Sequence, residues 1–377
     1  MNKQDKTFKI AILPGDGIGP EIIQQAVKTI NSIEVKYNLS FEMGFADFGA
    51  ISIDQHGIPF TEETEAICKN SDAVLLGAIG DLKYDNDPTI KVRPEQGLLA
   101  LRKSLGLFSN IRPLKIYDSL KDISPLKADR IDNVDIEIYR ELTGGIYFGE
   151  KGIDEEAKTA FDICSYSEME IERIAIKAFE AAKRRKNKLT LVDKANVLST
   201  SKLWRKVVQE IASNYPSVEV DYMFVDNAAM QLLIRPSQFD VILTENMFGD
   251  ILSDEASVLS GSIGLLPSAS IGEKYALFEP IHGSFPQAKG KGIANPIATI
   301  LSVAMLFDHL GLLEQATKVR EAVDFVIENN ILTPDLNSEN SFSTDYVGDV
   351  IACLIESENA FESINLENTI MNRMTII

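Results

Sequence analysis

Two acidic side chains with helical spacing, Asp250 and Asp254, are the first candidates for chemistry in this 377-residue chain. An apolar run from Phe239 to Leu243 precedes them and predicts a buried strand, and a helix-compatible segment follows Gly249. Four residues apart on a helix, the two carboxylates share one face and repel each other. A hard divalent cation between them would reverse that repulsion, because magnesium binds carboxylate oxygens. The alternative is two solvated aspartates at a helix start, which the helix dipole favours.

Three arginines in apolar surroundings could bind a substrate that carries carboxylates: Arg102 in Leu-Leu-Ala-Leu-Arg, Arg112 in Asn-Ile-Arg-Pro and Arg140 in Ile-Tyr-Arg-Glu-Leu-Thr. A guanidinium is planar and can bind a carboxylate through two parallel hydrogen bonds. The alternative for each arginine is an ion pair with a structural Asp or Glu, because charged side chains are rarely buried without a partner. Three such arginines in one acidic chain favour a polycarboxylate site.

Three further residues could transfer protons or complete a metal site. Lys194 follows a predicted buried strand, where active sites of open α/β sheets collect, and a lysine there can act as a base. Asp226 follows another strand and could be a third metal ligand, and Tyr147 is a candidate proton donor. The alternatives are a lysine whose ammonium reaches solvent and a tyrosine of the core or of an interface.

Alternating strands and helices must position these residues. Apolar runs alternate with helical patterns early in the chain, which predicts an α/β domain with strands at 8–13, 41–48 and 72–76. The middle of the chain differs, since it predicts an antiparallel arm or hairpin from strands at 135–140, 146–148 and 159–165. Ser167 and Glu170 have the spacing of a capping box and predict the start of the next helix.

A glycine-rich turn, Pro14-Gly-Asp-Gly-Ile-Gly-Pro-Glu21, follows the first predicted strand. It has the position of a dinucleotide fingerprint, but Pro20 stands where the third glycine of G-x-G-x-x-G should be. The turn therefore predicts a tight strand–helix connection and is weak support for a Rossmann cofactor site.

Composition excludes several classes of function. The formal net charge of −19 argues against nucleic-acid binding, which needs a basic face, and against binding to anionic membranes. The three cysteines, Cys68, Cys164 and Cys353, form no CxxC motif, so we expect no disulfide framework, no zinc finger and a reducing cytoplasm. The polar N-terminus lacks a signal-peptide core, and no apolar run is long enough to predict a membrane span.

Seven motifs resemble those of the isocitrate/isopropylmalate dehydrogenase family of β-decarboxylating dehydrogenases and follow one another in the family's order. The resemblance extends from about Phe8 to Glu356. The motifs are Leu13-Pro-Gly-Asp-Gly-Ile-Gly-Pro-Glu21, Arg93-Pro-Glu-Gln-Gly-Leu-Leu-Ala-Leu-Arg102, Ser109-Asn-Ile-Arg-Pro113, Arg140-Glu-Leu-Thr-Gly-Gly-Ile-Tyr-Phe-Gly149, Val192-Asp-Lys-Ala-Asn-Val197, Asn246-Met-Phe-Gly-Asp-Ile-Leu-Ser-Asp254, and Glu279-Pro-Ile-His-Gly-Ser284 through Gly292-Ile-Ala-Asn-Pro296.

The resemblance implies a two-domain α/β fold with a cofactor site that is not of the Rossmann type and a β-arm at a dimer interface. Residues 1–110 and 265–377 would form a discontinuous domain with most cofactor contacts. Residues 111–264 would form the metal, substrate and dimerisation domain. Lys194 and Asp226 would reach the site from the second subunit, which implies a homodimer with shared active sites.

The resemblance also implies an NAD-dependent oxidative decarboxylation, and it assigns the residues that would carry it. The two carboxylates of a malate-type substrate would be held by Arg102, Arg112 and Arg140, and Mg²⁺ or Mn²⁺ by Asp226, Asp250 and Asp254. The catalytic residues would be Lys194, which removes the hydroxyl proton, Tyr147, which protonates the enol, and Asp226. The cofactor would contact Glu95, Asn196, His282, Gly283, Ser284, Phe285, Gln287, Ala288, Ile293 and Asn295.

Leu98 and Leu99, one helical turn before Arg102, decide the expected substrate. In the family an apolar pair here matches an isopropyl group, whereas isocitrate dehydrogenases place a serine and an asparagine in this region. A carboxylate buried against two leucines would be costly, so 3-isopropylmalate is expected, converted to 4-methyl-2-oxopentanoate and CO₂ in leucine biosynthesis. Isocitrate, tartrate and other alkylmalates are the alternatives, because one methylene discriminates only modestly.

One position departs from the family pattern. NAD-using members usually carry an Asp just after Gly-Ser-x-Pro, where this chain has Gln287, followed by Ala288 and Lys289. Gln287 can accept a hydrogen bond from a ribose hydroxyl, but it repels a 2′-phosphate less than a carboxylate does. The Lys-Tyr pair of NADP-using relatives is absent, so NAD is the expected cofactor.

Overall fold

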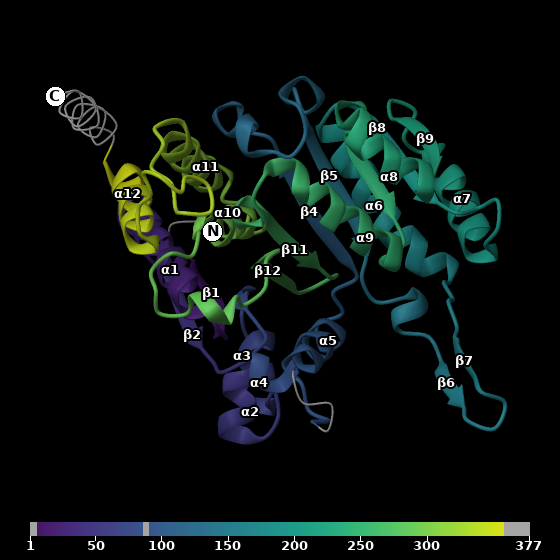
Figure 1. Ribbon diagram of the computed structural model, residues 1–377, viewed down its shortest axis with the longest axis horizontal. Helices are drawn as coiled ribbons and strands as arrows, with labels where there is room; N and C mark the ends of the chain where they lie inside the picture. The colour runs from purple at the N-terminus through teal and green to yellow at the C-terminus, as the bar shows by residue number, and fades with distance from the viewer. Residues whose placement is uncertain (1–5, 86–89, 358–377) are drawn as a thin grey trace. The chain divides into compact units, whose positions relative to one another are not determined.

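The computed structural model describes residues 6–85 and 90–357, and the chain divides into two compact units (Figure 1). The first unit takes its residues from Met1–Ser104, Ser262–Ser268 and Ala276–Ile377. The second comprises Leu105–Gly261 and Ala269–Tyr275. Both contain strands covered by helices, which confirms the predicted α/β class.

The first unit contains a parallel sheet with the strand order β2-β1-β3-β12. Every residue of β3 is buried, which explains why its sequence is a continuous apolar run without alternation. The strands of this sheet are β1 (Thr7–Gly15), β2 (Ser40–Phe45), β3 (Ala73–Ala78) and β12 (Ala276–Pro280). The helices of the unit are α1 (Gly19–Tyr37), α2 (Ala50–His56), α3 (Glu62–Lys69), α4 (Leu82–Asp85), α5 (Pro94–Ser104), α10 (Ile297–His309), α11 (Leu313–Glu328) and α12 (Thr344–Glu356).

The second unit contains a mixed sheet with the strand order β11-β4-β5-β10-β8-β9. The strands are β11 (Pro267–Ile271, paired with β4 through Ala269–Ile271), β4 (Ser109–Lys115), β5 (Asp135–Glu141), β10 (Val241–Thr244), β8 (Lys188–Asp193) and β9 (Glu219–Phe224). The first two pairings are antiparallel and the other three are parallel. The helices are α6 (Glu168–Arg184), α7 (Ser199–Ala212), α8 (Val225–Ile234) and α9 (Asn246–Ser257).

Side chains from α6 and α7 form the main core of the second unit on one face of this sheet. Trp204 and Phe179 are fully buried there with Leu189 and Leu191 of β8. The predicted capping box is confirmed: the Glu170 backbone N–H donates to the Ser167 hydroxyl, and the Ser167 backbone N–H donates to the Glu170 carboxylate. The capping box thus sets where α6 starts, and its apolar face sets how the helix packs against the sheet.

Two short strands, β6 (Lys151–Asp154) and β7 (Thr159–Asp162), form a separate antiparallel sheet that projects from the second unit in Figure 1. The predicted strand at 146–148 was wrong, because Gly145–Tyr147 forms a 3₁₀ turn. Gly145 has a φ of +73°, a conformation that glycine adopts without steric cost and that ends an extended segment.

No helix within residues 6–85 and 90–357 is both long enough and apolar enough to cross a membrane.

Candidate active site

The second unit brings together five of the predicted site residues. Tyr147 donates its hydroxyl to the Asp250 carboxylate at 3.1 Å, and the Arg140 guanidinium forms an ion pair with the same carboxylate. Arg112 lies 3.2 Å from Asp254 and 4.0 Å from Asp250. Two guanidiniums, two carboxylates and a phenol therefore form one cluster along α9.

Strand pairing and side-chain alternation explain this cluster. Arg112 on β4 and Arg140 on β5 come from neighbouring antiparallel strands, and β10 leads directly into α9. Arg140 is fixed by Asn246, whose backbone carbonyl and side-chain oxygen both accept from its guanidinium at 2.9–3.1 Å. Arg112 is fixed by Asn110 at 2.8 Å and by the Ser253 hydroxyl at 2.7 Å. Both guanidiniums are therefore held in place by neutral groups as well as by the aspartates.

Tyr147 has the properties of an accessible proton donor. Its side chain is exposed, so the phenol can reach both a bound molecule and solvent. Partial burial, and then the charge of the Asp250 carboxylate, raise the pKa of the Tyr147 phenol above its usual value. The phenol therefore carries its proton at neutral pH, as a donor must.

Lys194 and Asp226 form a separate pair in the same unit. Lys194 follows β8, Asp226 lies in the first turn of α8, and their side chains are joined by a hydrogen-bonded ion pair. That hydrogen bond lowers the pKa of the Asp226 carboxyl. Among the residues that the structure describes, no three Asp, Glu, His or Cys side chains gather closely enough to hold a metal ion. Asp226 therefore does not join Asp250 and Asp254 in a metal-binding group of a single chain.

In the first unit, Arg102 pairs with Glu279 at 2.9 Å, and its Nε atom is buried without a hydrogen-bond partner. Leu98 and Leu99 precede it on α5, and Leu99 is exposed. A largely buried guanidinium on the same helix as two leucines suits a ligand that combines a carboxylate with an alkyl group.

The predicted cofactor loop, residues 282–295, lies in the same unit as Arg102. The His282 Nε2 atom is buried without a partner, and burial lowers the pKa of this imidazole, so the neutral ring is favoured. Ser284 is buried, and its carbonyl oxygen accepts from the backbone N–H of Ile18 at 2.8 Å. A side chain at Gly17 would collide with that carbonyl. The glycine-rich turn therefore packs directly against the loop.

Most of the other residues predicted to contact the cofactor belong to this loop, and Glu95 and Asn196 lie outside it. Glu95 approaches Ser284 near Gly80, since a Cβ on Gly80 would lie 3.3 Å from the Ser284 hydroxyl and 3.4 Å from the Glu95 carboxylate. Asn295 and Ala288 are buried, whereas Gly283, Phe285, Gln287 and Ile293 are exposed. Asn196 is exposed in the second unit.

Three polar residues that sequence analysis did not single out support these sites. Asp335 accepts from Asn295 at 3.1 Å and from Ser262 at 2.6 Å, and so holds the end of the cofactor loop. Asn246 fixes Arg140, and Glu141 is a fully buried carboxylate beside the turn that carries Tyr147. The only local signal for Glu141 was a carboxylate two residues before a Thr-Gly-Gly turn, whose N–H groups need acceptors.

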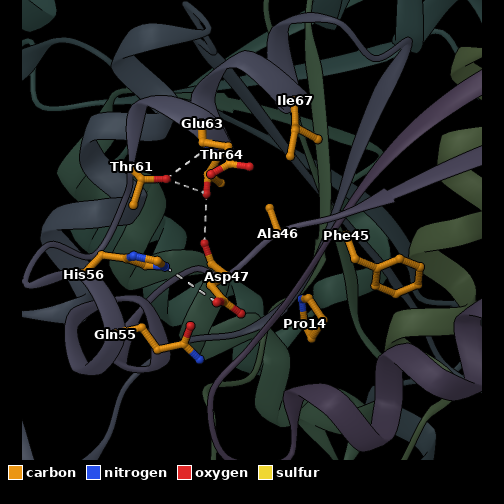
Figure 2. Close-up of a pocket in the computed structure, with 10 residues that line it drawn as sticks. All are labelled: Pro14, Phe45, Ala46, Asp47, Gln55, His56, Thr61, Glu63, Thr64 and Ile67. Carbon is orange, nitrogen blue, oxygen red and sulfur yellow. Dashed lines mark hydrogen bonds and ion pairs between the residues drawn. The ribbon is translucent and has the colours of Figure 1, made fainter.

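A cavity of about 330 Å³ in the first unit is lined by different residues (Figure 2). Asp47 and Glu63 supply negative charge, Phe45 and Ile67 supply apolar surface, and His56 lies 3.8 Å from the Asp47 carboxylate. None of the predicted site residues is among the ten that line this cavity, so it is separate from the clusters described above.

Glu245 is a buried carboxyl group between β10 and α9, in the second unit. Burial, and then the negative charge of Asp193, raise its pKa from 4.5 to about 7. Well below pH 4.5 the group is neutral in both the folded and the unfolded chain. As the pH rises, the unfolded chain releases this proton first, so the folded state loses stability until Glu245 ionises as well.

We expect Glu245→Gln to become progressively more stable than the wild type between pH 5 and pH 8, by up to roughly 3 kcal/mol, because glutamine removes this titration. Urea unfolding of both proteins at pH 5, 6, 7 and 8 measures the difference. The same difference between the two proteins at every pH would contradict the assignment.

The sequence of residues 9–351 matches the family model described as isocitrate/isopropylmalate dehydrogenase. The chain is 54% identical over 343 residues to a 3-isopropylmalate dehydrogenase of Bacteroides fragilis (strain YCH46), an alignment that covers 90% of this chain and 97% of the relative. It is 50% identical over 363 residues to the 3-isopropylmalate dehydrogenase of Bacillus subtilis (strain 168), covering 94% and 99%.

Solved structures agree with these sequence relatives. The isocitrate dehydrogenase of Methylococcus capsulatus superposes with a TM-score of 0.83 at 33% identity, covering 93% of this chain and 100% of the other. A β-decarboxylating dehydrogenase of Thermococcus kodakarensis superposes with a TM-score of 0.78 at 38% identity, covering 93% and 96%. These similarities confirm the predicted fold class.

Proposed function

The chain belongs to the isocitrate/isopropylmalate dehydrogenase family, and on this basis we propose that it catalyses the NAD-dependent oxidative decarboxylation of 3-isopropylmalate to 4-methyl-2-oxopentanoate and CO₂. This would be a step of leucine biosynthesis. The observation that carries the proposal is the cluster of Arg112, Arg140, Tyr147 and Asp250, which combines carboxylate binding, a cation ligand and a proton donor.

The predicted site residues, inside and outside this cluster, each have a part in this reaction that follows from their chemistry. Arg112 and Arg140, with Arg102, bind the two carboxylates of the substrate. Lys194 accepts the proton of the C2 hydroxyl, and Tyr147 donates a proton to C3 after CO₂ has left. A bound nicotinamide would supply the hydride acceptor for C2, and a divalent cation held by the aspartates would supply the positive charge that stabilises the C2 oxygen during decarboxylation.

The metal is proposed to be Mg²⁺ or Mn²⁺, because the donor set consists of carboxylates. Asp250 and Asp254 lie one helical turn apart, and Asp254 is the more exposed of the two. Hard divalent cations take oxygen ligands and fill their remaining positions with water and substrate. Asp226 would complete the protein ligands from the partner subunit.

The proposed assembly is a homodimer with shared active sites, and exposed apolar side chains support it. Ile153 of β6 is 80% exposed, and Phe161 of β7 is also exposed. Met230 and Ile234, on the same helix as Asp226, and Ile251, next to Asp250 in α9, expose further apolar surface. Such surface marks protein contacts.

Three free cysteines are compatible with a reducing location, which we propose to be the cytoplasm.

The decisive assay follows NADH formation with 3-isopropylmalate, isocitrate and tartrate, each with and without Mg²⁺. The proposal requires 3-isopropylmalate to be the best substrate and chelation to abolish its turnover. The isocitrate alternative is favoured by the structural similarity to an isocitrate dehydrogenase at 33% identity. Faster turnover of isocitrate or tartrate would replace the substrate assignment and leave the family unchanged.

The proposed cofactor is NAD, and Gln287 sets how strongly it is preferred. Gln287 is exposed on the cofactor loop, and Lys289 follows it closely. We expect Gln287→Asp to raise the ratio of kcat/KM for NAD over NADP by about 10-fold, because a carboxylate accepts from ribose hydroxyls and repels a 2′-phosphate. Steady-state kinetics with both cofactors measure the ratio. If the ratio fell or stayed constant, the adenosine ribose of the cofactor would not lie next to residue 287.

A further inference from the structure

A buried carboxylate holds the turn that carries Tyr147. Glu141 is the last residue of β5, and its side chain is 0% exposed. It accepts hydrogen bonds from the backbone N–H of Thr143 at 3.0 Å, from the backbone N–H of Gly144 at 2.7 Å and from the Thr143 hydroxyl at 2.9 Å. Three donors from two consecutive residues therefore fix the start of the Gly145–Tyr147 turn.

Arg173 of α6 provides the counter-charge for this carboxylate. Its guanidinium lies 3.3 Å from Glu141, donates to the Thr143 hydroxyl at 2.7 Å and stacks 4.4 Å from the centre of the Phe108 ring. A buried carboxylate is tolerated when a cation and hydrogen-bond donors surround it. Glu141 has both, so the start of the turn is tied to α6 as well as to β5.

Asn246 fixes the same turn from another side. Its side-chain amide donates to the carbonyl oxygen of Gly144 at 3.1 Å, and its backbone N–H donates to the Tyr166 hydroxyl at 3.0 Å. Asn246 is the first residue of α9, one turn before Asp250. The turn is therefore fixed relative to the helix that carries the acceptor of the Tyr147 hydroxyl.

We propose that Glu141 is a positioning residue for proton transfer by Tyr147, an inference that rests on the proposed function. In that step the O–H bond of Tyr147 breaks, a C–H bond forms at C3 of the enolate of 4-methyl-2-oxopentanoate, and the C2–C3 double bond becomes the C2=O double bond of the ketone. The tyrosinate then regains a proton from solvent. Glu141 and Arg140 are consecutive in β5, so their side chains leave opposite faces of the sheet. Loss of the Glu141 carboxylate would therefore displace the turn. The contacts of Arg140 with Asn246 and Asp250 of α9 would stay in place.

The test isolates the proton step from hydride transfer. Full-length enzyme with Mg²⁺ and NADH is incubated with 4-methyl-2-oxopentanoate in CO₂-free D₂O, and ¹H NMR follows exchange of the C3 protons. Glu141→Gln keeps the size of the side chain but places an NH₂ group against N–H donors. We expect it to slow exchange about 10- to 100-fold, because a displacement near 1 Å costs that much, while KM for 3-isopropylmalate changes little.

Glu137→Gln is the matched control. Glu137 lies on the same strand and face as Glu141, is partly buried and pairs with an arginine, Arg185, at 3.1 Å. Its side chain bonds to Arg185 and Tyr139 and not to the described residues of the turn, so we expect exchange at nearly the wild-type rate. If Glu141→Gln fails to fold, Thr143→Val removes only the shared hydroxyl and is expected to slow exchange in the same direction.

Equal rates in Glu141→Gln and Glu137→Gln would overturn the inference. The inference would also be overturned if Glu141→Gln slowed exchange by the same factor in a Tyr147→Phe protein as in the wild type. Glu141 would then act through a group other than Tyr147. A wild-type protein that neither oxidises 3-isopropylmalate nor exchanges the C3 protons would overturn the proposed function instead.

Discussion

Replacing Lys194 with alanine is expected to lower kcat by about 10²- to 10⁴-fold, the range that a positioned general base contributes. The Lys194 side-chain nitrogen is hydrogen-bonded to Asp226, so it is already oriented by a neighbouring side chain. Alanine removes the group that accepts the C2 hydroxyl proton and leaves the arginines of the second unit in place. Steady-state kinetics at saturating 3-isopropylmalate and NAD give kcat directly.

Lys194→Arg separates the base from the charge. Arginine keeps a positive charge that can pair with Asp226, but a guanidinium does not release its proton in this pH range. The arginine variant should therefore be as impaired as the alanine variant. Recovery of most activity in Lys194→Arg would show that this position contributes charge and that another group is the base.

Asp250→Asn is expected to weaken Mn²⁺ binding and substrate binding together, and to lower kcat/KM by roughly 10²-fold or more, since a metal contributes several kcal/mol to such a reaction. Asp250 meets Arg140 and Tyr147 as well as the proposed cation position. Mn²⁺ titration followed by electron paramagnetic resonance, with and without 3-isopropylmalate, measures both affinities. Wild-type turnover of the variant in the presence of a chelator would mean that the two aspartates are merely solvated.

Mixing the two variants tests the shared site. If Lys194 and Asp250 of one site come from different subunits, a heterodimer of Lys194→Ala and Asp250→Asn chains contains one doubly altered site and one intact site. Random exchange of subunits then restores about a quarter of the wild-type activity, because half of the dimers are heterodimers with half of their sites intact. No recovery after subunit exchange would place both residues in the site of one chain.

Asp250 and Asp254 illustrate what the sequence could predict. Their spacing of four placed them on one face of one helix, and α9 has both of them within reach of Arg112. The capping box at Ser167 was equally accessible, because it depends on residues three positions apart. Both features follow from the periodicity and end chemistry of a single helix, which are local properties.

The segment around Tyr147 shows where local patterns fail. An apolar triplet beside two strands suggested another strand, whereas Gly145 directs the chain into a 3₁₀ turn. The interactions that hold this turn join residues far apart in sequence, since Arg173 is 32 residues from Glu141 and Asn246 is 102 residues from Gly144. No periodicity encodes which buried carboxylate will meet which N–H group. The same holds for Asp335 at the end of the cofactor loop.

The pairing of Arg112 and Arg140 with Asp250 and Asp254 has a thermodynamic consequence. Within the protein, the groups suited to a dianion and the groups suited to a divalent cation serve as counter-ions to each other. A cation alone would bind beside two guanidiniums, and a dianion alone would bind beside two carboxylates. When both bind, the added charges sum to zero. The arginines then pair with the dianion in place of the aspartates, and the aspartates pair with the cation in place of the arginines. Each ligand should therefore raise the affinity of the other by the same factor, so the metal–substrate chelate is the species for which this arrangement is selective.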